Sequence, residues 1–149
     1  MTVTVERGRA DDVVEDGFAV RRAVFIDEQG VSEDVEMDGR DDEATHFVAY
    51  DGDHPVGTAR LRVVEEGVGK VERVAVRGEY RERGVGRALM ADVEAHAADR
   101  GLATLKLHAQ TRVETFYRKL GYETTSGVFQ EAGIDHVAMR KDLERGDPS

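Results

Sequence analysis

The feature that most restricts the fold of this sequence is a strand that runs into a glycine-containing turn and then into a helix. The segment 70–76 has the composition of a strand and breaks at Arg77-Gly78. After the turn 81–86, apolar residues recur at helical spacing at Val85, Leu89, Val93 and Ala97. The first N–H groups of a helix have no partner within it and lie at the positive end of its dipole. The turn is therefore predicted to bind an anion.

The residues of the turn are suited to bind a phosphate, and they exclude two well-known types of phosphate-binding loop. Gly84 and Gly86 present nothing that would obstruct a phosphate, and arginines can add charge around it: Arg81, Arg83 and Arg87. A P-loop would need Lys-Ser or Lys-Thr after the last glycine, where this chain has Arg87-Ala88. A dinucleotide-binding fold would need a third glycine or alanine in register within a parallel βαβ unit, and the strands before this turn look antiparallel. The turn does match the pattern Arg/Gln-x-x-Gly-x-Gly/Ala.

Length and composition limit the classes of protein that come into question. With 149 residues, we expect one domain over residues 1–144 and a disordered tail at 145–149. The net charge of −10 argues against a nucleic-acid partner, since phosphate backbones are bound by clustered Lys and Arg. No apolar run is long enough for a membrane span, and the absence of Cys excludes disulfides and thiolate-bound zinc, so we expect a cytoplasmic protein. The acidic composition fits a halophilic source and an ordinary acidic protein about equally well.

The remaining elements are predicted from periodicity and turn residues. We expect the order strand, helix, three antiparallel strands, helix, strand, helix, strand, strand, which is a mixed α/β domain. Asp11 or Asp12 is expected to cap the first helix and Thr111 the last one. The acidic segment 32–43 is expected to be a solvated loop or helix edge, although it could also steer a cationic substrate. The expected strands are 3–7, 45–50, 55–64, 70–76, 102–109, 122–129 and 136–140, and the expected helices are 11–29, 85–100 and 111–120.

With these motifs in place, the chain resembles the GNAT superfamily of acetyl-CoA-dependent N-acetyltransferases. The turn Arg81–Gly86 is similar to the pyrophosphate loop of that family, and 71–76 is similar to the strand that precedes it. The segment 110–122, with Phe116-Tyr117 followed by Gly121-Tyr122, is similar to its second signature. The resemblance implies the GNAT fold, which is an α/β (α+β) domain with a mixed, mostly antiparallel sheet of about six to seven strands flanked by about four helices. It also implies acetyl-CoA as co-substrate.

Three further segments resemble the ElaA-like branch of the superfamily: 24–30, 107–110 and 131–139. One residue departs from the pattern of the superfamily, because Gln110 stands where many members carry Asn. The cofactor-binding residues that the resemblance implies are Val74, Ala75, Val76, Arg81, Arg83, Gly84, Val85, Gly86, Arg87, Gln110 and Tyr117.

The resemblance also implies direct attack of a primary amine on the thioester, with no covalent enzyme intermediate. An amine with a pKa near ~10 is mostly protonated at neutral pH, so removing its proton costs roughly 4 kcal/mol without a base. Tyr117 is the expected proton donor to the departing thiolate, with a core tyrosine as the alternative. A backbone N–H near Val74 is expected to stabilise the oxyanion. Glu72, two residues earlier on the strand, is the expected base, with a surface ion pair as the alternative.

The acceptor site is expected to involve residues of the ElaA-like segments and histidines on strands. A histidine can relay protons near neutral pH, yet a single strand histidine is more often a hydrogen-bonded structural residue. No spacing of histidines indicates a metal site. The candidate acceptor-binding residues are Glu28, Gln29, His46, His108 and His136, with His136 ranked first among the histidines.

Two other functions are compatible with the same turn. A catalytically silent acyl-CoA-binding module, acting on a protein partner, would keep the turn and need neither Tyr117 nor a base. A nucleotide would be a different phosphate ligand for the turn. The acceptor is left open between a small amine, an amino sugar and a protein lysine or N-terminus. The oligomeric state is left open as well, although sheet edges of this architecture often pair into homodimers.

Overall fold

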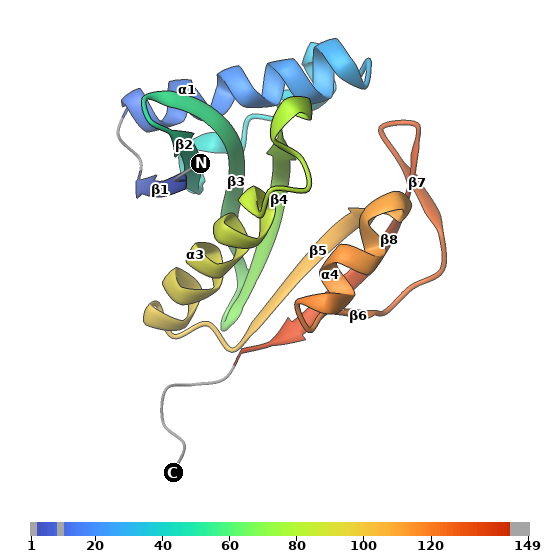
Figure 1. Ribbon diagram of the computed structural model, residues 1–149. Coiled ribbons are helices and arrows are strands. Elements are labelled where there is room, and N and C mark those ends of the chain that lie inside the picture. Colours follow the sequence, from blue (N-terminus) through green and yellow to red (C-terminus); the bar gives the residue numbers. More distant parts are fainter. Residues whose placement is uncertain (1–2, 9–10, 144–149) are drawn as a thin grey trace. The chain divides into compact units, whose positions relative to one another are not determined.

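The computed structural model describes residues 3–8 and 11–143 of the chain, which form two compact units (Figure 1). The first unit contains the described residues up to Arg62 together with Arg73–Val93. The second unit contains Val63–Glu72 and the described residues from Glu94 onward. The tail 145–149, for which we expect disorder, lies outside the described residues.

The first unit begins with a strand and a long helical segment. Its elements are β1 (Val3–Gly8), α1 (Asp11–Arg21), a π-helical continuation η1 (Arg22–Glu28), α2 (Glu33–Glu36), the 3-10 turn η2 (Asp41–Glu43) and β2 (Thr45–Asp51). Three elements have residues in both units: β3 (His54–Glu65), β4 (Val68–Val76) and α3 (Val85–Asp99). The 3-10 turn η3 (Gly78–Tyr80) lies between β4 and α3. The predicted helix up to Gly30 is thus confirmed, and its last part is π-helical. Its expected caps, Asp11 and Asp12, have side chains outside the described part of the structure.

The second unit holds the other strands and the last helix. Its elements are β5 (Thr104–Gln110), the 3-10 turn η4 (Thr111–Val113), α4 (Glu114–Lys119), β6 (Glu123–Thr124), β7 (Phe129–Glu131) and β8 (Ile134–Asp142). The hydrogen-bonded order is β1-β2-β3-β4-β5-β8-β6, with β7 paired to β8. The first residues of β4 pair in parallel with β5, whereas β1–β2, β2–β3, β5–β8, β6–β8 and β7–β8 are antiparallel. The expected mixed, mostly antiparallel sheet is confirmed.

The start of α3 is placed by close packing against the backbone of β3. A Cβ atom at Gly57 would lie 2.8 Å from Val85 Cγ1 and 2.9 Å from Leu89 Cδ1. Glycine allows this approach without any shift, because a Cβ contact under 3 Å would force a neighbouring atom to move. Val85 and Leu89 are fully buried at this contact. The turn 81–86 therefore leads into a helix whose first residues are held against β3.

Glycines end both helices that follow, as the sequence indicates. Gly101 has a φ of 78°, and the N–H of Leu102 donates to the carbonyl of Ala97. Gly121 has a φ of 101°, and the N–H of Tyr122 donates to the carbonyl of Tyr117. Both are Schellman-type ends, in which the positive φ turns the chain and satisfies a terminal carbonyl.

The expected cap of the last helix is wrong. Thr111 is the first residue of the 3-10 turn η4, and α4 begins only at Glu114 with Val113 at its N-cap. Neither N-cap position makes a side-chain capping hydrogen bond. The chain enters α4 through 3-10 geometry, which brings the N–H of Glu114 to the carbonyl of Thr111.

The acidic segment 32–43 is not simply solvated, and this prediction is corrected. Glu36 is only 2% exposed and receives the Arg21 guanidinium, whose Nε donates to Oε1 at 3.0 Å. Arg73 approaches the same carboxylate at 2.7 Å. Arg21 is itself buried, so this is an ion pair of the interior of the first unit.

Two further carboxylates extend the pair into a network. Arg60, 1% exposed, donates to Asp38 at 2.7 Å and to Asp41 at 3.0 Å, and Arg21 donates to Asp41 at 2.7 Å. Burial by itself would raise the pKa of Asp38 and of Asp41, but the hydrogen bonds and charges of these arginines hold both pKa values below their usual range. We name Arg21, Arg60, Arg73, Glu36, Asp38 and Asp41 the arginine–carboxylate network.

Removing one member of the network is expected to destabilise the protein strongly. Glu36→Gln removes the buried carboxylate that Arg21 and Arg73 share, which costs about 3–5 kcal/mol of unfolding free energy. Glu33→Gln is the matched control, because that carboxylate of the same short helix pairs with Arg22 where both side chains are more than half exposed and contributes about 0–1 kcal/mol. Urea unfolding of both variants measures the difference. Equal losses would show that the network does not hold the unit together.

The network is also expected to make stability depend on acid. Because the folded-state pKa of Asp38 is depressed, its contribution is fully present above the unfolded-state value near ~4 and is lost progressively as pH falls from there through the folded-state pKa. Asp38→Asn should therefore lower the unfolding free energy clearly at pH 7 and less at pH 3. Asp53→Asn, in the exposed turn between β2 and β3, controls for the loss of one negative charge. A loss for Asp38→Asn that is the same at both pH values would contradict the assignment.

Candidate functional site

The predicted anion loop has the required backbone form. Glu82 and Gly84 both have positive φ, 63° and 84°, and turn the chain from η3 into α3. The first N–H to bond back along the helix is that of Ala88, which donates to the carbonyl of Gly84 at 3.0 Å. The N–H groups of Val85, Gly86 and Arg87 therefore precede the helical hydrogen-bond ladder and are suited to receive an anion.

Arg81 is held in place by a carboxylate from another element of the same unit. Its Nε donates to the carbonyl of Val76 at 3.0 Å, Nη1 forms a short contact with Glu28 Oε1, and Nη2 donates to Glu28 Oε2 at 2.7 Å. This bidentate hydrogen bond raises the pKa of Arg81 further. The structure thus brings together two predicted site residues from different groups, the loop residue Arg81 and the acceptor candidate Glu28.

The end of β4 leads directly into this loop. Ala75 is buried against Val20 and Val24 of the first helical segment, while Val74 and Val76 are partly exposed. Arg73, just before them, has a φ of 55°, a left-handed conformation that is uncommon for a residue with a Cβ. It interrupts the regular alternation of β4 beside Val74, the position predicted to supply an oxyanion-binding N–H. Sequence reasoning missed Arg73, because no local signal marks a positive φ at an arginine within a strand.

Of the other acceptor candidates in the first unit, Gln29 follows η1 and is partly exposed. His46 is 2% exposed on β2, and its Nε2 lies 3.0 Å from the carbonyl oxygen of Asp41. Burial lowers the pKa of His46. These are the contacts of a structural histidine, which was the alternative interpretation.

Tyr117 lies in an aromatic cluster of the second unit. Its ring meets those of Phe116 and Tyr122 edge to face, with centroids 5.0 and 5.9 Å away, and the residue is 6% exposed. Burial raises the pKa of Tyr117, so the phenol stays protonated near neutral pH and keeps the form that donates a proton. The neighbouring Tyr122 donates its hydroxyl to Glu94 Oε2 at 3.0 Å.

Glu72 and Gln110, two more predicted residues, also belong to the second unit. Glu72 Oε2 lies 3.5 Å from Lys70 Nζ, and the Glu72 side chain is 10% exposed. The ion-pair alternative for Glu72 is thus present in the structure, with Lys70 of the same strand. Gln110 ends β5, and its Oε1 accepts a hydrogen bond from Arg112 Nε at 2.9 Å.

The predicted His108 and His136 come together with a residue that sequence reasoning missed. His108 Nδ1 lies 2.8 Å from Glu131 Oε1, and His136 Nε2 lies 3.8 Å from Glu131 Oε2. Strand pairing explains the cluster, since His136 on β8 stands opposite Gln110 of β5 on one side and Phe129 of β7 on the other. The only signal for Glu131 was its place in the segment 131–139; its contact with β5 depends on a strand order that the local sequence does not show.

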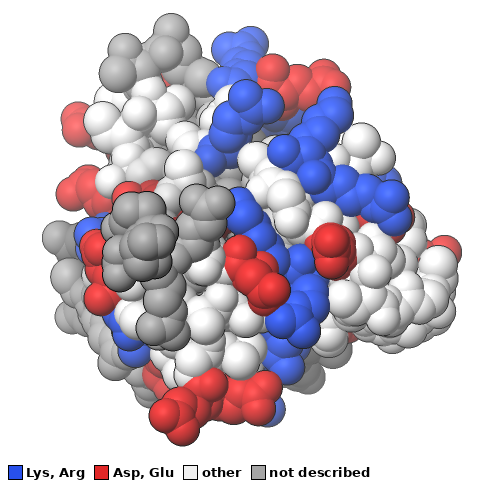
Figure 2. All heavy atoms as spheres, turned by 90° about the horizontal axis from the view of Figure 1, so that it is seen from below, with Lys and Arg blue, Asp and Glu red and all other residues white. Residues whose placement is uncertain are grey.

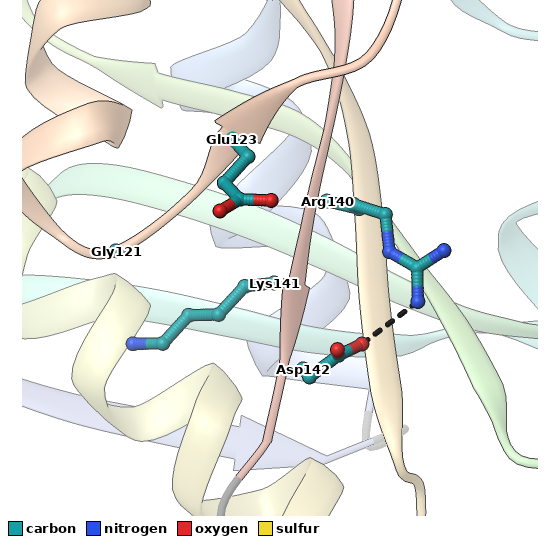
Figure 3. Close-up of a pocket in the computed structure, with 5 residues that line it drawn as sticks. All are labelled: Gly121, Glu123, Arg140, Lys141 and Asp142. Atoms are coloured by element: carbon teal, nitrogen blue, oxygen red, sulfur yellow. Dashed lines mark hydrogen bonds and ion pairs between the residues drawn. The ribbon is translucent and has the colours of Figure 1, made fainter.

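A shallow polar pocket of the second unit was not predicted (Figure 3). It is lined by Gly121, Glu123, Arg140, Lys141 and Asp142. Arg140 and Asp142 form an ion pair across 2.8 Å, and the Lys141 ammonium is turned away toward Glu94 and the carbonyl of Leu120. The charged groups of Arg140, Lys141 and Asp142 are thus engaged with one another or with neighbouring elements, and none of the predicted site residues lines the pocket.

The surface carries basic as well as acidic side chains. On the face shown in Figure 2, basic side chains lie next to acidic ones despite the net charge of −10. Among the described residues, no group of three or more His, Asp or Glu side chains has the arrangement of a metal site. No helix in the described part of the chain is long and apolar enough to cross a membrane.

Comparison with known proteins decides the family. Residues 9–143 match the model of the acetyltransferase (GNAT) domain, and the match covers residues of both units. The chain belongs to the GNAT acetyltransferase family. It is 42% identical over 133 residues to the uncharacterized N-acetyltransferase YjcF of Bacillus subtilis, covering 89% of this chain and 94% of that protein. The uncharacterized protein YyaT of the same organism is 37% identical over 146 residues, covering 96% and 98%.

Solved structures agree with this assignment. A crystal structure of a candidate N-acetyltransferase from Lactobacillus plantarum superimposes with a TM-score of 0.90 at 33% identity, covering 97% of this chain and 100% of that one. Escherichia coli ElaA has the same fold, with a TM-score of 0.83 at 22% identity over 94% and 99% of the two chains. The GNAT fold is confirmed, and the protein is an acyltransferase of the GNAT type.

The pair of Arg81 and Glu28 predicts opposite effects of two substitutions on the binding of CoA. Arg81→Gln removes a cation from the anion loop and should weaken binding about 10-fold or more, the value of a charge-assisted hydrogen bond. Glu28→Gln removes a carboxylate that competes for Arg81 and should tighten binding by up to about 5-fold, as for a partly exposed ion pair. Isothermal titration calorimetry with CoA measures both.

Arg100→Gln, which removes the same charge at the other end of α3, is the control for net charge. If Arg81→Gln and Arg100→Gln changed the Kd for CoA equally, the loop would have no special part in binding.

Proposed function

We propose that this GNAT acyltransferase moves the acetyl group of acetyl-CoA to a primary amine by direct attack in a ternary complex. The observation that carries the proposal is the loop of Gly84–Arg87, whose N–H groups precede the helical ladder of α3 beside Arg81. In the proposal this loop holds the pyrophosphate of CoA, with Arg83 adding charge. The backbone at the end of β4, Val74–Val76, is proposed to pair with the pantetheine arm, and Gln110 to supply an amide contact.

Tyr117 is proposed to protonate the departing thiolate. Breaking the thioester leaves a negative sulfur, and an acid placed nearby lowers the barrier to its departure. The place of Tyr117 in the Phe116-Tyr117 signature supports the role, and its phenol is protonated at neutral pH, as a proton donor must be. The N–H near Val74 is proposed to receive the negative charge that develops on the thioester oxygen.

Glu72 is proposed to take the proton that the nitrogen releases as the amide forms. A carboxylate is a weak base in water, but a side chain only 10% exposed loses part of its hydration. Lys70 at 3.5 Å can compensate the charge of Glu72 between turnovers.

The activity is tested by thiol release from acetyl-CoA over a panel of amines. We expect turnover by the unaltered protein and a loss of about 100-fold or more in kcat for Tyr117→Phe, the usual share of a general acid, with the Kd for CoA changed less than about 3-fold. Tyr122→Phe is the matched control, because it removes a hydroxyl from the adjacent ring whose partner is Glu94. Its kcat should stay close to that of the unaltered protein.

Other outcomes of the same assay separate the remaining functions. Tight binding of CoA without turnover on any amine would favour an acyl-CoA-binding regulatory module. A rise in melting temperature with ATP or NAD but not with CoA would show that the loop holds a nucleotide. Equal losses for Tyr117→Phe and Tyr122→Phe would assign Tyr117 to the core.

A further inference from the structure

The side chains of His108, Glu131, His136 and Phe129 form a cluster that has no role in the proposed acetyl transfer. It lies on three adjacent strands of the second unit, with β8 between β5 and β7. The side chains of Glu131 and His108 are 44% and 32% exposed, so solutes can reach them, whereas that of His136 is 9% exposed. One carboxylate and two imidazoles thus meet at a place that is open to solvent.

The partners of the two imidazoles fix where their protons lie. A carbonyl oxygen only accepts hydrogen bonds, so His136 Nδ1, 2.7 Å from the carbonyl of Ile134, must be the N–H of that ring. An ionised carboxylate also only accepts, so His108 Nδ1 carries the proton that it shares with Glu131. In both neutral rings Nε2 is therefore an acceptor.

The geometry leaves a gap between acceptors. His136 Nε2 and Glu131 Oε2 are 3.8 Å apart, which is too long for a hydrogen bond between them. When His136 is neutral, its Nε2 and Glu131 Oε2 are both hydrogen-bond acceptors, so neither can donate a hydrogen bond to the other. A group with several N–H donors and a positive charge complements this arrangement, and a primary ammonium has three such donors.

The aromatic ring of Phe129 also favours a cationic ligand. The Phe129 ring lies edge to face with His108, with centroids 5.0 Å apart, and stacks on His136 at 6.2 Å. A phenyl face attracts a cation that sits over it, which adds to the charge of the carboxylate. The cluster offers no cationic side chain other than the imidazoles themselves to receive an anion.

We propose that His108, Glu131, His136 and Phe129 form the docking site for the ammonium group of a primary amine acceptor, with Glu131 as its anchor. The inference rests on the proposed acetyl transfer and names its substrate class, a cationic primary amine. His108 holds the carboxylate through its Nδ1–H, and both imidazoles add their Nε2 acceptors. An alcohol of the same shape lacks both the charge and two of the donors.

The site is tested by binding and by kinetics on the same variants. Tyramine, spermidine, glucosamine and an alanine-terminated peptide serve as probes, and tyrosol is the neutral analogue of tyramine. The ring protons of His108 and His136, assigned from His108→Gln and His136→Gln, are followed by NMR during each titration in the presence of CoA. Thiol release gives the KM values for the amine and for acetyl-CoA.

We expect at least one amine to shift both ring signals while tyrosol does not. Glu131→Gln should raise the Kd or KM for that amine about 10- to 100-fold, the value of a hydrogen bond to a charged group, and leave the KM for acetyl-CoA unchanged. Asp135→Asn is the matched control, because it removes a carboxylate from the same β7–β8 hairpin, where Asp135 contacts Gln130. It should change neither constant.

The inference and the proposed function fail in different ways. If amines are acetylated but leave both histidine signals unmoved, or if Glu131→Gln and Asp135→Asn raise the KM equally, the docking site is wrong and the acetyl transfer stands. If amines shift both signals and depend on Glu131 but no acetyl group is transferred, the docking site stands and the proposed function is wrong. If no amine of the panel shifts either signal, the docking site is wrong.

Discussion

Arginine side chains that meet carboxylates inside the first unit connect its separate elements. Arg21 comes from α1, Arg60 from β3 and Arg73 from β4, and all three reach into the segment of Glu36–Asp41. Because an unpaired charge costs far more in the interior than at the surface, each of these elements depends on the others being in place. The network also engages Arg73 at the residue where β4 takes a left-handed turn beside Val74. The backbone proposed to bind the oxyanion is thus continuous with an ion-paired interior.

The sequence was sufficient for the features that local rules control. Gly101 and Gly121 end helices because only a residue without a Cβ adopts their φ cheaply, and the anion loop follows from a strand, two glycines and a helix. The acidic segment could not be predicted in the same way. The partners of Glu36 lie 15 and 37 positions away along the chain, so its burial is decided by tertiary contacts. Thr111 shows the same limit on a smaller scale, since 3-10 geometry at η4 replaces the side-chain cap.

The acceptor region shows which part of a site a sequence can reveal. His108 and His136 stood out as residue types able to move protons or bind cations, yet nothing local joined them. The register of β5, β8 and β7 brings them to one carboxylate, Glu131, and to one ring, Phe129. His46 also stood out by its residue type and its predicted strand, but it contacts the carbonyl of Asp41 and not this cluster. Strand order, rather than composition, distinguishes a packed histidine from one that solutes can reach.

The contact between Arg81 and Glu28 has a consequence for binding. In the structure one guanidinium serves the end of the first helical segment, and in the proposed complex the same group serves a pyrophosphate. Arg81 cannot contact Glu28 and the pyrophosphate fully at the same time. Binding of CoA in the loop would therefore free the Glu28 carboxylate for another cation. By the same linkage, a cation that binds Glu28 in place of Arg81 would ease the entry of CoA. Occupancy of the loop and of the Glu28 carboxylate would then rise together, a coupling that arises from a single shared side chain.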